Sequence, residues 1–297
     1  MKITFLYIVL LIPATMAFSQ NGEEKVLTHH EADDRYGSYS PDGAHIIFES
    51  NRDGNWEIYS MDADGKNQQR LTNNEADDRR PSWHPNGKKI IFESDRSGTN
   101  QLYVLSLRNR KIKPVNIEGL DGEPIFARFS PDGKEIAFSC KKSDDTSNIM
   151  IISKNGKKVK SLTSNPFRSH YPNWSPDGKM LLFFSRHETD NEDDEIYKIN
   201  RDGSGEKRLT HWPKHNFCPS WSNDGKRIAY VTSMQDNRPE IFIMDANGEN
   251  ASRVTYNNDG DTLPNWSMDN KKLLITAYRN GNYEICELSI DPDPAHK

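Results

Sequence analysis

The stretch Tyr171–Lys179, which reads YPNWSPDGK, decides the fold because variants of it recur along the whole chain. Its aromatic position is occupied in turn by Tyr39, Trp83, Phe129, Trp174, Trp221 and Trp266. Successive aromatic positions lie 44, 46, 45, 47 and 45 residues apart. A fixed period of this size is typical of a repeat architecture.

A polar turn follows each aromatic residue. The turns are SPDG at Ser40–Gly43, HPNG at His84–Gly87, SPDG at Ser130–Gly133 and Ser175–Gly178, SNDG at Ser222–Gly225 and SMDN at Ser267–Asn270. Proline presets φ, and Asp-Gly or Asn-Gly tolerates positive φ, so these segments predict tight hairpins.

Two further strands are predicted in every repeat. The apolar strands are Ile46–Glu49, Ile90–Glu93, Ile136–Ser139, Met180–Ser185, Ile228–Thr232 and Leu273–Ala277. The third strands are Glu57–Met61, Gln101–Leu105, Asn148–Ile152, Glu195–Ile199, Glu240–Met244 and Tyr283–Leu288. In most repeats a second turn and a Leu-Thr pair then end the unit. Four short strands in about 45 residues form one propeller blade, so the sequence predicts an all-β, six-bladed propeller of antiparallel blades.

These repeats resemble the propeller repeats of the TolB family of the periplasmic Tol–Pal system. The resemblance covers nearly all of the chain after residue 20 and implies the fold more specifically than it implies a function. TolB proteins carry an additional N-terminal α/β domain, and the sequence between Gln20 and Lys25 leaves no room for one.

The two ends of the predicted propeller complement each other. Val26-Leu27-Thr28 matches the closing Leu-Thr segments although no blade precedes it, and the last repeat stops near Ile290 without such a segment. We therefore expect the N-terminal strand to supply the missing outer strand of the last blade, within one domain spanning residues 20–290. Such pairing would also cover an exposed sheet edge. Residues 291–297 are predicted to be a disordered tail.

Residues 1–19 have the features of a secretory signal peptide: one lysine, an apolar run from Ile3 to Ile12 and small residues before Gln20. The apolar run is shorter than the roughly 20 residues that a membrane-spanning helix needs. We expect a periplasmic or secreted protein that is not embedded in a membrane. The net charge of −5 and the absence of a basic stripe argue against a nucleic-acid partner.

The segments that precede the aromatic strands are predicted to surround the mouth of a central channel. The candidate binding residues there are Asp33, Asp34, Arg35, Asp77, Asp78, Arg79, Glu123, Arg168, His170, His215, Phe217 and Asp261. The sequence EADDR occurs twice, at Glu31–Arg35 and Glu75–Arg79. In a closed ring, blades six, one and two would place carboxylates on one side of the mouth, opposite Arg168, His170 and His215. The alternative is ordinary local pairing of aspartate with arginine.

A non-catalytic platform that binds a protein or peptide at the mouth is the favoured function, and no cofactor is expected. The sequence contains no Gly-x-Ser-x-Gly elbow and no glycine-rich phosphate loop. One alternative is a metal-dependent polysaccharide lyase related to oligogalacturonate lyase, in which His170 and His215 would hold the metal. Another is an oligosaccharide-binding propeller that uses Trp56, Tyr171, Trp212 and Phe217 as stacking surfaces.

The three cysteines, Cys140, Cys218 and Cys286, fall in different predicted blades. Because they are odd in number and scattered along the chain, no disulfide framework is expected.

Overall fold

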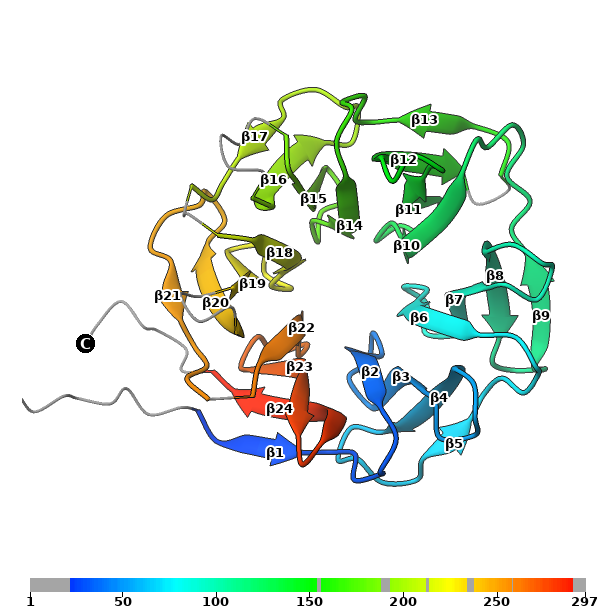
Figure 1. Ribbon diagram of the computed structural model, residues 1–297, viewed down its shortest axis with the longest axis vertical. Coiled ribbons are helices and arrows are strands. Elements are labelled where there is room, and N and C mark those ends of the chain that lie inside the picture. The colour runs from blue at the N-terminus through cyan, green and yellow to red at the C-terminus, as the bar shows by residue number, and fades with distance from the viewer. Residues whose placement is uncertain are drawn as a thin grey trace, which may run out of the picture.

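The computed structural model describes residues 22–153, 156–187, 193–211, 214–233, 238–257 and 259–290. Within these ranges the chain forms six four-stranded antiparallel sheets arranged as a ring, and no helix (Figure 1). This confirms the predicted six-bladed propeller. No helix in the described ranges has the length and apolar character needed to cross a membrane. The predicted signal peptide and C-terminal tail lie outside the described residues.

Strand order in each blade runs outward from the ring axis. The inner strands are β2 (Asp34–Tyr39), β6 (Asp78–Trp83), β10 (Glu123–Phe129), β14 (Ser169–Trp174), β18 (Asn216–Trp221) and β22 (Asp261–Trp266). The second strands are β3 (His45–Ser50), β7 (Lys89–Ser94), β11 (Glu135–Lys141), β15 (Met180–Ser185), β19 (Arg227–Ser233) and β23 (Lys272–Arg279). The third strands are β4 (Glu57–Asp62), β8 (Gln101–Ser106), β12 (Ser147–Ser153), β16 (Glu195–Asn200), β20 (Pro239–Asp245) and β24 (Asn282–Ser289). The outer strands are β5 (Gln69–Arg70), β9 (Lys111–Pro114), β13 (Val159–Ser161), β17 (Lys207–Arg208), β21 (Ser252–Arg253) and β1 (Glu24–Val26).

The N-terminal strand closes the ring, as predicted. β1 pairs antiparallel with β24, and Val26 lies opposite Cys286 (Figure 1). Beyond the strand, the Leu27 N–H donates to the Ile285 carbonyl at 2.9 Å. The last blade is therefore built from both ends of the described chain, and its three C-terminal strands gain a partner along their open edge.

The polar turns owe their shape to a serine and an aspartate. In the first blade the Ser40 hydroxyl donates to Asp42 Oδ1 at 2.5 Å and accepts the His45 N–H at 2.9 Å, while Gly43 takes a φ of 72°. The same serine contacts recur at Ser130, Ser175, Ser222 and Ser267. The turns gather at one end of the ring, which we call the turn face. The end at which the inner strands begin is the mouth face.

Every inner strand contains a bulge three residues before its aromatic position. The residues there are Tyr36, Arg80, Phe126, Tyr171, Cys218 and Leu263, and their φ angles lie between 50° and 61°. The pairing register shifts at each of them. Positive φ is costly for non-glycine residues and needs support from the surroundings. In the first and fourth blades that support is a hydrogen bond from the neighbouring blade: Tyr36 N–H to Thr276 Oγ1 and Tyr171 N–H to Ser139 Oγ, both 3.2 Å.

The core lies between neighbouring blades. The second strands contribute large side chains with almost no exposed surface: Phe48, Phe92, Phe138, Phe183 and Tyr230. The repeated aromatic position is buried at Tyr39, Trp174, Trp221 and Trp266, while Trp83 and Phe129 are half-buried. All three cysteines are buried free thiols, in agreement with the expectation that they form no disulfide framework.

Candidate functional site

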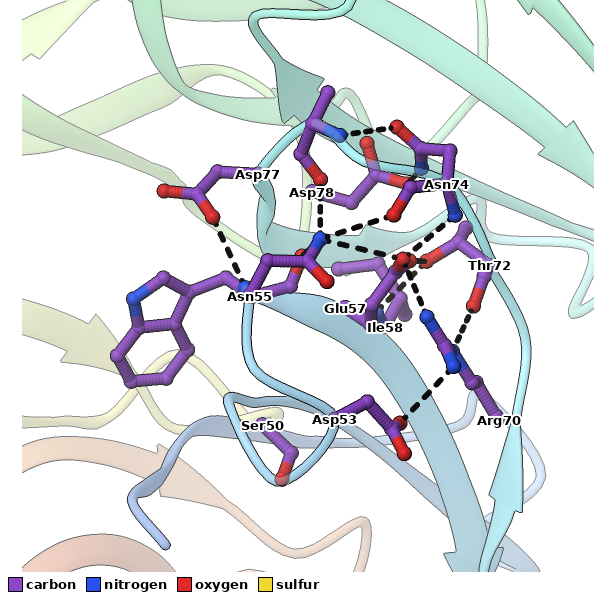
Figure 2. Close-up of polar contacts among 12 residues, drawn as sticks. Ser50, Asp53, Asn55, Glu57, Ile58, Arg70, Thr72, Asn74, Asp77 and Asp78 are labelled. Carbon is purple, nitrogen blue, oxygen red and sulfur yellow. Dashed lines mark hydrogen bonds and ion pairs between the residues drawn. The ribbon is translucent and has the colours of Figure 1, made fainter.

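The Leu-Thr pair that ends most blades belongs to a buried polar cluster. Figure 2 shows Glu57, at the start of β4, in contact with Thr72 and Arg70. The Thr72 hydroxyl donates to Glu57 Oε2 and accepts the Ile58 N–H at 2.9 Å, while Arg70 Nη2 donates to Glu57 Oε1 at 2.7 Å. Equivalent threonine–glutamate pairs are Thr28–Glu284, Thr210–Glu195 and Thr255–Glu240. The second blade has Gln101 and Asn116 at these positions and is one of the repeats without a Leu-Thr pair.

The two EADDR copies join neighbouring blades. The first aspartate of each copy accepts a backbone N–H from the preceding blade: Asp33 from Tyr283 and Asp77 from Trp56, both at 3.0 Å (the Asp77 contact is drawn in Figure 2). The first aspartates thus fasten the mouth-face loop before the third strand of the preceding blade. Asp33 and Asp77 therefore have a structural role.

The second aspartates are enclosed in ion pairs within their own blades. Asp34 accepts two hydrogen bonds from Arg52 Nη2 at 3.0 and 2.8 Å, and Asp78 accepts two from Arg96 Nη2 at 2.7 and 2.6 Å. Asp261 is paired with Arg279 at 2.9 Å. Burial raises the pKa of all three carboxyls, and the arginines oppose that shift. Since none of these aspartates has exposed surface, they cannot contact a partner directly.

Two arginines are partly exposed on blades one and two, beside the partly exposed Asp33. The side chains of Arg35 and Arg79 are 29% and 30% exposed. The Arg35 guanidinium lies 4.2 Å from the Tyr283 ring centre and 5.2 Å from that of Trp56, and Arg79 lies 4.7 Å from Trp56. We call these four residues the arginine ladder. The aspartates expected to form an acidic side of the mouth are thus buried or engaged in local contacts.

Two buried glutamates lie beneath the arginine ladder. Glu49 Oε2 accepts the Arg80 N–H at 2.6 Å, and its Oε1 is 3.5 Å from Arg79 Nη2. Glu93 pairs with Arg80 Nη1 at 2.6 Å and accepts the Phe126 N–H at 2.6 Å. Sequence reasoning missed this cluster. The available signal was the repeated Phe-Glu-Ser, which places a glutamate inside each of two apolar strands.

On blades four and five, the structure brings four predicted mouth residues together. Arg168, His170, His215 and Phe217 line one pocket of about 280 Å³, with Phe184, Arg186, Asp194 and Ser233. Asp194 organises the polar side of this pocket: it accepts from Arg186 Nε at 3.0 Å, and its Oδ2 lies 3.1 Å from His215 Nδ1. Sequence reasoning missed Phe184, Arg186 and Asp194.

The two candidate metal ligands lie in different surroundings. His170 is wedged between Phe126 and Phe184, with ring centres 5.7 Å away on both sides, and burial followed by the Arg168 charge lowers its pKa to about 4. His215 has its Nδ1 engaged by Asp194. Within the described residues no group of three His, Cys, Asp or Glu side chains could hold a metal ion.

The remaining predicted residues lie apart. Glu123 is exposed and lines a separate pocket of about 450 Å³ between blades two and three. Tyr171 is buried, so it offers no stacking surface for a sugar. Trp212 lies outside the described residues. On the turn face, the aromatic positions of all six blades line a hollow of about 350 Å³.

Comparison with known proteins gives matches along nearly the whole chain. Residues 19–192, 118–231 and 188–296 match a family model described as the TolB beta propeller domain. A 55-residue stretch is 38% identical to the uncharacterized peptidase YuxL of Bacillus subtilis (strain 168), which covers 18% of this chain and only 8% of that protein.

Two solved structures illustrate the shared fold. The structure of putative TolB from Agrobacterium tumefaciens superposes with a TM-score of 0.64 at 24% identity, over 75% of this chain and 86% of that one. Oligogalacturonate lyase in complex with manganese gives a TM-score of 0.63 at 15% identity, over 93% of this chain and 95% of that one. At these identities the similarity concerns the fold alone.

Proposed function

Because the chain belongs to the TolB beta propeller domain family, we propose that it is a non-catalytic binding protein whose mouth face takes a protein or peptide partner. The fold supplies a rigid ring, and the loops between strands supply the surface on which function usually resides.

The pocket on blades four and five is the observation that carries this proposal. Its apolar walls, Phe184 and Phe217, have ring centres 6.3 Å apart, and charged groups surround them. Its volume of about 280 Å³ suits one large side chain of a partner better than a whole metabolite. Phe167, which is 42% exposed, directly precedes the pocket residue Arg168 in the chain, and its ring centre lies 6.5 Å from that of His187. An aromatic or aliphatic side chain of a peptide, buried between Phe184 and Phe217, would act as the anchor.

Export is part of the proposal. The charge, length and small-residue end of residues 1–19 support cleavage before Gln20 and a periplasmic or extracellular location. Mass spectrometry of the protein isolated from the cells that produce it tests this point. The expected mature chain begins at Gln20, and an intact Met1 would contradict export through a cleaved signal.

Selection from a random peptide library tests the binding proposal. Peptides selected on the purified protein should share an apolar residue and should lose affinity for a Phe217→Asp variant that keeps its melting temperature. The matched control is Met268→Asp, because Met268 is an exposed apolar residue on the turn face. If the peptides bind Phe217→Asp with unchanged affinity but fail to bind Met268→Asp, the binding surface lies on the turn face and the proposal is refuted.

A further inference from the structure

The arginine ladder contains hydrogen-bond donors that the described chain does not use. A guanidinium group carries five N–H donors. Arg35 makes one hydrogen bond to a described residue, at 2.7 Å to Asp33, and Arg79 makes none. The Nε atoms of both are buried without a partner. Arg79 Nη2 lies 3.5 Å from Glu49 Oε1. By contrast, Arg52 and Arg96 at the same junctions each make two hydrogen bonds to a fully buried aspartate. Arg35 and Arg79 therefore keep unused N–H donors on this part of the mouth face, within the residues that the structure describes.

The aromatic rings hold these guanidinium groups in place. Trp56 has a guanidinium carbon within about 5 Å of its ring centre from both Arg35 and Arg79, and Tyr283 stacks on Arg35. Stacking fixes the plane of each guanidinium and lowers the entropy lost when it binds an acceptor. Two positive charges beside one indole repel each other, so a bound anion would relieve that repulsion.

The nearby carboxylates leave donors of both guanidinium groups unused. Glu49 and Glu93 are buried. Glu93 pairs with the Arg80 side chain, whereas Glu49 accepts the Arg80 N–H and also lies 3.5 Å from Arg79 Nη2. Asp33 is half-buried and already bonded to Arg35. Part of each guanidinium is open to a partner that approaches blades one and two, on the same loops as the exposed Glu31 and Glu75.

We propose that Arg35 and Arg79, positioned by Trp56, bind a carboxylate of an acidic segment in the partner. Carboxylate oxygens accept paired hydrogen bonds from guanidinium groups, and the planar geometry of arginine suits this contact better than lysine does. This inference rests on the proposed function, since it concerns the same mouth face. It adds a charged contact on blades one and two to the apolar anchor on blades four and five.

A matched set of short peptides tests the inference. The probes are rhodamine-labelled ten-residue peptides of alternating Glu and Gly, with Gln–Gly and Lys–Gly counterparts, and binding is measured by fluorescence anisotropy at low and high salt. We expect the Glu–Gly peptide to bind at least about tenfold more tightly than the Gln–Gly peptide, as a charge-assisted hydrogen bond allows. Its affinity should fall as salt rises. The Lys–Gly peptide should not bind.

Variants locate the contact. Arg79→Gln and Arg35→Gln should each weaken binding of the Glu–Gly peptide about tenfold in protein that circular dichroism shows to be folded, and Arg79→Lys should not restore full affinity. Lys88→Gln, which removes an exposed positive charge from the turn face, should have no effect. Equal binding of the Glu–Gly and Gln–Gly peptides would overturn the inference, as would equal losses in Arg79→Gln and Lys88→Gln.

The two proposals can fail separately. Suppose that library-selected peptides depend on Phe217 but are insensitive to both arginine variants and contain no acidic residue. The mouth face would then remain the binding surface, and the carboxylate contact would be refuted. If the selected peptides are insensitive to Phe217, Arg35 and Arg79 alike, both proposals fall.

Discussion

The Thr28 hydroxyl donates a 2.5 Å hydrogen bond to Glu284 Oε2, joining two residues 256 positions apart in the sequence. Thr28 Oγ1 also accepts the Ile285 N–H at 2.9 Å. Thr72 makes the same two contacts within the first blade, with Glu57 and Ile58. The ring is therefore closed by the same buried pair that ends a blade built from continuous chain.

Replacing Thr28 by valine should destabilise the protein by about 1–3 kcal/mol, because the buried Glu284 carboxylate and the Ile285 N–H would each lose a hydrogen-bond partner. Thr72→Val should have a similar effect. The exposed Thr99 provides the control, and Thr99→Val should change stability by less than about 0.5 kcal/mol. Urea denaturation measures all three. A Thr28→Val protein as stable as the wild type would show that the closing strand contributes little.

Deletion of residues 21–28 should have a larger effect than Thr28→Val, since it removes the whole of β1 and exposes the edge of β24. We expect a loss of several kcal/mol from a total that is typically 5–15 kcal/mol, together with aggregation. Calorimetry and light scattering check this. An unchanged melting temperature and a monodisperse protein would contradict it.

Trp174→Ala should destabilise the protein by about 3–5 kcal/mol, the usual effect of removing a large buried aromatic side chain. Trp174 is 7% exposed and donates its indole N–H to the Arg128 carbonyl of the preceding blade. Tyr256, 45% exposed, is the comparison residue, and Tyr256→Ala should cost far less. Equal losses in urea denaturation would mean that Trp174 does not lie in the interface between blades.

The sequence predicted the fold well because the fold depends on a repeated local pattern. The turn residues and the aromatic positions can be interpreted from the local sequence alone. The same holds for Val26-Leu27-Thr28, a closing segment with no blade before it. The role of Asp34 was harder to predict, because it depends on burial. Its partner Arg52 lies 18 residues further on, and Asp78 has Arg96 at the same separation. This recurring separation of aspartate and arginine is visible in the sequence and is typical of a structural ion pair rather than of an exposed binding site.

The arrangement of the pocket on blades four and five could be predicted only in part. His170 and His215 were placed at the mouth from their position before an inner strand, and both line the pocket. Phe184 and Asp194 come from β15 and from the segment before β16, and only the packed structure brings them to the same place. An apolar strand residue such as Phe184 has no feature in the sequence that separates it from the core.

The neutral His170 predicts a pH effect on stability. Its folded-state pKa of about 4 lies below the ordinary 6.5, so the unfolded state takes up the proton first as pH falls. The contribution of neutral His170 to the free energy of unfolding is therefore fully present above about pH 6.5. It decreases by up to about 3 kcal/mol as the pH falls towards 4. His170→Asn should show a smaller fall in unfolding free energy between pH 7 and pH 4.5 than the wild type. Identical pH profiles would show that His170 is not kept neutral by burial.

Site-specific photo-crosslinking tests most directly the claim that the mouth face is the binding face. The crosslinker benzoylphenylalanine would replace Phe167 on the mouth face or Met268 on the turn face, two side chains of similar exposure at 42% and 45%. In the cells that produce the protein, we predict a defined crosslinked partner from position 167, weakened by Arg35→Gln with Arg79→Gln, and none from position 268. A defined partner captured from position 268 and not from position 167 would contradict the account.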